Sequence, residues 1–240
     1  MKWFFLCKFT NLLKHTRISR FKNNIGGNIM DHLKKSHLSF IKKDCIAQFG
    51  LAAGTKIYYD AFVIMTELLE DADFRNSKAV EKHMRGFILP EIAYYRALQK
   101  NEIGKEKAYQ FLDDEIQKRA QKSSRVFGAF KRLPWFFSIV KLVIKKAMAY
   151  GFPKEGWNTE WKVDNNNELA MNMHSCLYME TFTKYGCPEL CIASCDSDVT
   201  TFRGMEPKVV FLRTQTLSKG ADYCNFRYMN GKRLNKFRFV

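Results

Sequence analysis

The chain has 240 residues, of which 46% are hydrophobic and 27% charged, and this composition is typical of a folded globular protein. It excludes an intrinsically disordered chain, which has far fewer apolar residues. The formal net charge is +16, but residues 1–43 alone contain ten Lys or Arg and one acid, which accounts for +9 of it. The charge therefore indicates a basic terminal segment more than a nucleic-acid-binding fold.

Residues 1–29 are predicted to form a basic extension outside a single folded domain that spans residues 30–240. The extension is either a solvated tail or a peripheral contact to phosphates or anionic lipid. Lys8 interrupts the apolar run after Met1 before it reaches the length of a signal peptide. We therefore expect a cytoplasmic protein whose seven cysteines are reduced.

Apolar residues recur at helical spacing up to about residue 150, in segments that begin near Asp44, Ser77 and Ile103. A fourth, more apolar helix is expected over residues 127–150. Lysines interrupt its apolar run, which stays far below the ~20 residues that a membrane span needs. This pattern favours a buried helix whose lysines reach solvent over a helix on a membrane surface.

Three residues predict irregularities within these helices. Gly50 and Gly54 indicate a break or a close helix crossing in the first helical segment. Pro90 falls inside the second, where its ring and its missing N–H predict a kink or a restart.

Strands are expected from about residue 157, where the periodicity changes to two. The predicted strands are Leu169–Cys176, Val199–Phe202, Lys208–Thr214 and Tyr223–Met229, with a short helix over Cys187–Cys195 between the first two. Helices first and antiparallel strands last predict an α+β fold. In this fold the N-terminal helical half packs on a C-terminal, mostly antiparallel sheet that encloses a small-molecule pocket.

Five of the seven cysteines lie between residues 167 and 228, and three of them, Cys187, Cys191 and Cys195, step by four along the predicted helix. Such thiols are either packed in the core or ligands of a metal or iron–sulfur cluster. Structural zinc sites use close C-x-x-C pairs and cluster sites use tighter runs, and neither occurs here. We therefore expect no metal and no cofactor.

Cys176, Cys195 and Asp198 are the candidate catalytic residues. We expect Cys176 at the end of a strand and Cys195 at the end of the short helix, so that both thiols reach a cleft. A thiolate can attack an electrophilic carbon and form a covalent intermediate. Alternatively, Asp198 acts as general base on a water while a thiol donates the proton to the leaving group.

Four further residues, Arg213, Thr214, His174 and Cys224, are predicted to bind the substrate. Arg213 ends an apolar strand, where a buried guanidinium needs an anionic partner. That partner is either Asp198 or a substrate carboxylate held by two hydrogen bonds. His174 is expected on the same strand face as Cys176, as a structural residue or as a base.

Several short motifs occur in an order that resembles the L-2-amino-thiazoline-4-carboxylic acid hydrolase family, over about residues 44–228. They are Ile88-Leu-Pro90-Glu-Ile-Ala-Tyr-Tyr-Arg-Ala-Leu98, Lys105-Glu-Lys-Ala108, Cys176-Leu-Tyr178, Gly186-Cys-Pro-Glu-Leu-Cys191, Cys195-Asp-Ser-Asp198, Arg213-Thr-Gln-Thr-Leu-Ser-Lys-Gly220 and Asp222-Tyr-Cys224-Asn-Phe226. The final Gly-x-x-x-Cys-x-Phe also resembles the end of vinyl-reductase-type small-molecule-binding domains.

The resemblance implies hydrolytic opening of an aminothiazoline carboxylate to N-carbamoyl-cysteine. The ring carbon between nitrogen and sulfur is electrophilic, and the ring sulfur leaves as a thiol. Cys176, Cys195 with Asp198, and Arg213 would act as nucleophile, proton donor and carboxylate ligand. The alternatives are a non-catalytic small-molecule-binding or sensor module of related fold, and a metal or iron–sulfur protein. The expected partner is a small substrate and not a specific nucleic acid, with any membrane contact made by residues 1–29.

Overall fold

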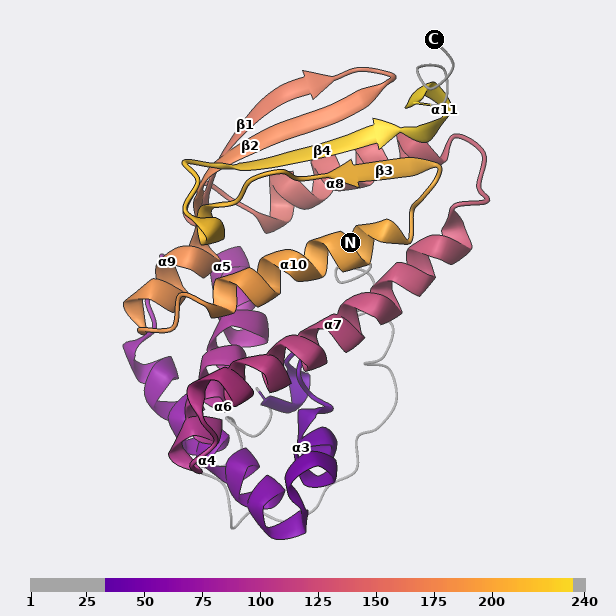
Figure 1. Ribbon diagram of the computed structural model, residues 1–240. Coiled ribbons are helices and arrows are strands. Elements are labelled where there is room, and N and C mark those ends of the chain that lie inside the picture. Colours follow the sequence, from indigo (N-terminus) through magenta and orange to yellow (C-terminus); the bar gives the residue numbers. More distant parts are fainter. Residues whose placement is uncertain (1–32, 235–240) are drawn as a thin grey trace, which may run out of the picture.

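The computed structural model describes residues 33–234, so the predicted extension over residues 1–29 lies outside the described residues. Helices occupy the described chain up to residue 151, and a four-stranded antiparallel sheet follows at one end of the molecule (Figure 1). The long helices α7 and α10 run between the sheet and the helices at the other end (Figure 1). The predicted α+β class, with the helical half first, is confirmed.

The helices α3 (Ile41–Phe49) and α4 (Leu51–Asp71) are separated at Gly50, whose φ of 83° is in the left-handed region that favours glycine. A Cβ atom on Gly54 would lie 2.6 Å from the Cα of Ile46. The two helices therefore cross in close contact at Gly54. Both predicted irregularities, a break and a close crossing, occur here.

The second helical segment consists of α5 (Lys78–His83), a π-helical turn η1 (Met84–Ile88) and α6 (Leu89–Lys100). Ser77 caps α5, because its side chain accepts a hydrogen bond from the Val80 N–H at 3.4 Å. Pro90 lies in the first turn of α6, where its missing N–H is tolerated. The π turn just before it produces the predicted restart of the helix.

The third helix, α7 (Lys105–Phe130), is longer than its apolar pattern suggested, and α8 (Phe136–Gly151) begins only after a turn. The predicted helix over residues 127–150 is therefore wrong at its start. Its apolar inner side is buried, as expected, through residues such as Val140 and Ile144. Among residues 33–234, no helix is long and apolar enough to cross a membrane.

The sheet has the strand order β1-β2-β4-β3, and each neighbouring pair is antiparallel. The strands are β1 (Trp157–Asp164), β2 (Glu168–Cys176), β3 (Val209–Leu212) and β4 (Cys224–Asn230). The central pair places Met173 opposite Cys224 and Met171 opposite Phe226. Strands that are distant in sequence therefore lie side by side, which brings Cys176 at the end of β2 and Cys224 at the start of β4 to the same end of the sheet.

Two helices connect β2 to β3, α9 (Leu177–Lys184) and α10 (Leu190–Arg203), and one prediction fails there. Residues 199–202 are the end of α10 and not a strand. The ring of Phe202 packs on Phe211 and Tyr228, with centroids at 4.8 and 5.3 Å, and this contact with the sheet holds the helical conformation. The short elements η2 (Leu217–Lys219) and α11 (Gly231–Leu234) flank β4.

Candidate functional site

A cavity of about 270 Å³ lies between the sheet and the helices. This volume is close to the lower limit of ordinary ligand pockets, about 300–1,000 Å³, and suits a small molecule. Most of the wall is apolar. Its apolar side chains include Ile116 from α7, Ile144 and Met148 from α8, Trp157 from β1, Met171 and Met173 from β2, and Phe226 from β4.

Three thiols meet on one side of this cavity. Cys176 lies at the end of β2, and Cys191 and Cys195 lie one turn apart on α10. Cys195 is in the middle of a 14-residue helix and not at its end, so the prediction of a terminal position is wrong. Cys187 precedes α10, is buried, and does not line the cavity.

The side chain of His174 points away from the cavity, contrary to the prediction that it shares a strand face with Cys176. In the pairing of β1 with β2, Ser175 lies opposite Asn158 but Met173 lies opposite Thr159, which leaves His174 as an extra residue. A bulge of this kind shifts the alternation of side chains by one position. Cys176 therefore faces the cavity together with Met173.

His174 instead belongs to the solvent side of the sheet. Its Nε2 lies 3.1 Å from Oε2 of Glu160, and its ring packs 5.5 Å from that of Tyr223. Both members of the ion pair are well exposed, so the contact is a surface pair.

The hydrogen bonds of the thiol cluster shift its pKa values in opposite directions. Hydrogen bonding to the Cys191 thiol lowers the pKa of Cys176, and the backbone N–H groups of Met179 and Tyr178 at the start of α9 lower it further. Hydrogen bonding to Cys191 also lowers the pKa of Cys195. The pKa of Cys191 is raised, because it is hydrogen-bonded to both neighbours.

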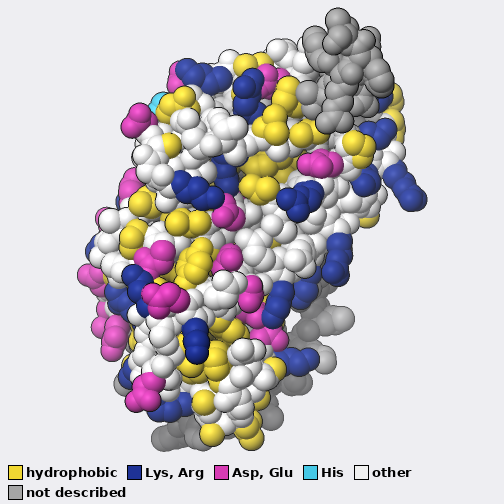
Figure 2. Space-filling view, viewed as in Figure 1, with side chains coloured by type: hydrophobic (Ala, Val, Ile, Leu, Met, Phe, Trp, Pro, Cys, Tyr) yellow, Lys and Arg dark blue, Asp and Glu magenta, His cyan; other side chains and the backbone are white. Residues whose placement is uncertain are grey.

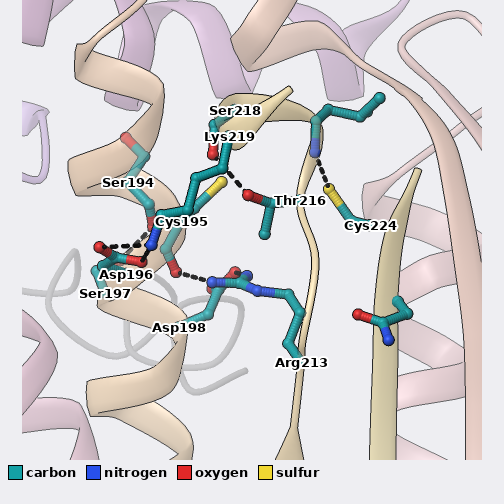
Figure 3. Close-up of polar contacts among 12 residues, drawn as sticks. Ser194, Cys195, Asp196, Ser197, Asp198, Arg213, Thr216, Ser218, Lys219 and Cys224 are labelled. Atoms are coloured by element: carbon teal, nitrogen blue, oxygen red, sulfur yellow. Dashed lines mark hydrogen bonds and ion pairs between the residues drawn. The ribbon is translucent and has the colours of Figure 1, made fainter. Parts of the chain in front are cut away.

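Asp198 and Arg213 form an ion pair next to Cys195 (Figure 3). The Arg213 Nη1 lies 3.0 Å from Asp198 Oδ2, and Nη2 donates to the Cys195 carbonyl oxygen at 2.7 Å. The Arg213 side chain is 2% exposed and does not line the cavity, whereas Asp198 lines it and is 41% exposed. Its place in the cavity wall withdraws the Asp198 carboxyl from bulk solvent, which raises its pKa, and the charge of Arg213 opposes this rise. Of the two predicted partners, the internal carboxylate is the one that Arg213 contacts.

Of the two remaining predicted residues, Cys224 lines the cavity and Thr214 does not. Thr214 is outside it, where its Oγ1 accepts a hydrogen bond from Asn225 Nδ2 at 2.7 Å. Cys224 is buried and lines the cavity, and its Sγ accepts a hydrogen bond from the Leu217 N–H at 3.2 Å (Figure 3). Burial raises the pKa of Cys224 to about 11, so this thiol stays protonated at neutral pH.

A buried carboxylate that the sequence analysis missed, Glu91, also lines the cavity. It is 2% exposed, its Oε2 accepts a hydrogen bond from Ser194 Oγ at 2.9 Å, and its Oε1 lies 2.9 Å from His37 Nε2. Glu91 is the charged member of a run of seven buried residues at the start of α6. A carboxylate within such an apolar run was the available signal, since acids are almost never buried without partners.

A second unanticipated contact joins His83 to Tyr178 at the cavity wall. The Gly151 carbonyl oxygen can only accept, so His83 Nε2 donates to it at 2.9 Å. His83 Nδ1 then accepts from the Tyr178 hydroxyl at 3.0 Å. Burial lowers the pKa of His83 to about 4, so the ring is neutral at physiological pH.

Among the described side chains of residues 33–232, no group of three or more His, Cys, Asp or Glu could hold a metal ion. Residues 81–228, more than half of the chain, match the family model described as L-2-amino-thiazoline-4-carboxylic acid hydrolase. The match includes all seven predicted site residues. No curated protein and no solved structure matches the chain.

Proposed function

This chain belongs to the L-2-amino-thiazoline-4-carboxylic acid hydrolase family, and we propose that it opens a small heterocyclic substrate of the amidine or isothiourea type. The model reaction is conversion of L-2-amino-thiazoline-4-carboxylate to N-carbamoyl-L-cysteine. The proposal is supported by one observation above all, that Cys176, Cys195 and Asp198 line the same small cavity.

Cys176 is the nucleophile in this proposal. Cys191 has a single S–H proton and can donate it to one neighbouring sulfur at a time. This hydrogen bond therefore stabilises a thiolate at either Cys176 or Cys195, but not at both. Cys176 has additional support from two backbone N–H groups at the start of α9, and Cys195 has it from Ser218 and Arg213 but is opposed by the charge of Asp198. We place the thiolate at Cys176, where no carboxylate is among the groups that raise the pKa.

The Cys176 thiolate adds to the amidinium carbon between the ring nitrogen and the ring sulfur. The bond from this carbon to the ring sulfur then breaks, and the Cys195 thiol donates a proton to the departing sulfur. The Asp198 carboxylate takes a proton from water, which adds to the same carbon and displaces Cys176 as a thiolate, and Asp198 passes this proton to the Cys195 thiolate. The oxygen of the product carbamoyl group comes from this water, and the remaining proton goes to solvent.

Two basic residues divide the electrostatic work in this proposal. Arg213 is a positioning residue, because its guanidinium holds Asp198 and the Cys195 carbonyl oxygen and is almost fully buried. Among the described residues, Lys82 is the one Lys or Arg that lines the cavity. In this proposal its ammonium binds the substrate carboxylate. This replaces the earlier hypothesis that Arg213 holds the carboxylate directly.

The test is turnover of L-2-amino-thiazoline-4-carboxylate, followed as N-carbamoyl-cysteine by mass spectrometry. Cys176→Ala is expected to lower kcat by more than about a thousandfold, because it removes the nucleophile. Asp198→Asn is expected to lower it about a hundred- to ten-thousandfold, because it removes the general base that activates water. Lys82→Met is expected mainly to raise KM.

Cys187→Ala is the matched control, since Cys187 is a thiol of the same region that does not reach the cavity. It is expected to retain kcat and KM. Product formation by Cys176→Ala at the rate of the unmodified protein would contradict the proposed nucleophile. Absence of product from the unmodified protein would contradict the proposed substrate.

A further inference from the structure

Exposed apolar side chains are concentrated on the outer side of α8 and the turn before it. Ten large apolar residues are exposed among those that the structure describes, and six of them lie within residues 130–150. Trp135 is 79%, Tyr150 76% and Leu142 56% exposed. We define the α8 patch as five of these apolar residues and three neighbouring cations: Leu133, Trp135, Ile139, Leu142, Tyr150, Lys131, Arg132 and Lys146.

The α8 patch is one side of a helix whose other side belongs to the core. Val140 and Ile144 are buried, while Trp135, Ile139 and Leu142 follow one another at spacings of three and four on the exposed side. Trp135 has a φ of 53°, a conformation that bulky residues rarely adopt. This conformation holds a large aromatic ring in solvent at the start of α8.

The sequence segment that contains the α8 patch carries charge of a single sign. Residues 116–154 contain ten Lys or Arg and no Asp or Glu. Lys141 and Lys145 pair with Asp164 of β1, whereas Arg132 and Lys146 of the patch are exposed. The face shown in Figure 2 carries both signs, with Asp and Glu side chains scattered among those of Lys and Arg.

We propose that the α8 patch docks the protein onto the surface of an anionic lipid bilayer. Exposed Trp, Tyr and Leu favour the interface between headgroups and acyl chains, and Lys and Arg favour anionic headgroups. The inner side of α8 lines the cavity through Ile144 and Met148. Docking therefore places the cavity about one helix diameter, roughly 10 Å, from the lipid surface.

The experiment is cosedimentation of the full chain with phosphatidylcholine vesicles that contain phosphatidylserine. Trp135→Ser/Leu142→Ser is compared with Leu51→Ser/Tyr59→Ser, whose residues are 73% and 64% exposed on α4. Residues 1–29 are present in every variant, so their binding cancels in the comparison. The patch variant is expected to bind at least about tenfold more weakly, and the α4 variant as well as the unmodified protein. Added salt and vesicles of phosphatidylcholine alone are expected to weaken binding.

Equal binding by the patch variant and the unmodified protein would overturn the proposal, as would no binding by either. Analytical ultracentrifugation of the same variants tests a second explanation, in which the patch is the interface of a dimer. Conversion of a dimer to a monomer by Trp135→Ser/Leu142→Ser would show that a second copy covers the patch, and would also overturn it. Short duplex RNA that binds more tightly than the vesicles, with no effect of the patch variant, would assign the positive charge to nucleic acid instead.

Discussion

Cys191 governs the ionisation of the two thiols beside it, because each of them depends on the same S–H proton. The pKa of Cys176 is lowered, so alkylation of Cys176 by iodoacetamide is expected to rise at a lower pH than that of an ordinary thiol. Peptide mass spectrometry over a pH series measures this directly. In Cys191→Ala the donor is lost, and the alkylation profile of Cys176 is expected to move to higher pH.

Cys187 provides the internal reference for this measurement, since burial raises its pKa to about 12. It is expected to react only at high pH in the same samples. A profile of Cys176 that coincides with that of a free cysteine, or one that Cys191→Ala leaves in place, would show that the cluster does not activate this thiol.

His83 makes stability depend on pH. Its pKa is about 4 in the folded protein against 6.5 for an unperturbed His, so the unfolded state binds more protons between these values. The contribution of His83 to the free energy of unfolding is therefore fully present above pH 6.5 and is lost as pH falls towards 4, by about 3 kcal/mol in total. Urea unfolding across this range is expected to show a shallower decline in His83→Gln than in the unmodified protein.

The comparison between variants is needed because Glu115 acts in the opposite direction. Burial raises the pKa of Glu115 to about 7, so its contribution is present below its unperturbed value of 4.5 and is lost as pH rises to 7. This contribution is common to both proteins and cancels. Identical slopes for the unmodified protein and His83→Gln would contradict the assignment of a neutral buried ring.

Single residues could be predicted where their chemistry was unusual for their surroundings. Cys176, Cys195 and Asp198 stood out as thiols and a carboxylate near expected ends of elements, and all three line the cavity. Glu91 was missed, because its burial depends on contacts with His37 and Ser194, which are distant in sequence. The bulge that turns His174 outward depends on the partner strand and leaves no mark in the local pattern.

At the scale of elements, the crossing of α3 and α4 gives the sharpest prediction. A Cβ on Gly54 would lie 2.6 Å from backbone atoms of Ile46. Backbone atoms cannot relieve this clash by a change of rotamer, as a side chain could. Gly54→Ala is expected to destabilise the fold by at least about 1–3 kcal/mol. Gly86→Ala is the control, since nothing lies within 4 Å of its added Cβ, and it is expected to be neutral or slightly stabilising. Equal urea midpoints for the two variants would contradict the close crossing.

Elements were predictable where one period dominated the pattern. The strands β2, β3 and β4 and the starts of α5 and α7 follow from local sequence. Residues 199–202, Val-Thr-Thr-Phe, have strand-forming side chains, yet they end α10 because the ring of Phe202 packs against the sheet from a continuous helix. The length of α10 in turn moves Cys195 away from a helix end and onto the cavity wall.

At the scale of the whole molecule, the fold brings thiols and carboxylates from distant parts of the sequence to the wall of one largely apolar cavity. The sheet and α10 supply the thiols, α10 supplies Asp198, and α8 separates the cavity from the α8 patch. A small heterocycle bound there is surrounded largely by apolar groups, where the ion pair of Asp198 with Arg213 is stronger than in water. The sequence indicated an enclosed pocket, but the convergence on it depends on the pairing of β2 with β4.

The most direct test of the central claim is the mass of Cys176 during turnover. Asp198→Asn is mixed with L-2-amino-thiazoline-4-carboxylate and quenched, and the peptides are analysed by mass spectrometry. Because ring opening expels no fragment, the Cys176 peptide is expected to gain the whole mass of the substrate. The Cys187 peptide is expected to stay unmodified. Covalent catalysis by Cys176 would be contradicted if the wild-type protein turns over the substrate while the Cys176 peptide gains no mass and Cys176→Ala loses no rate.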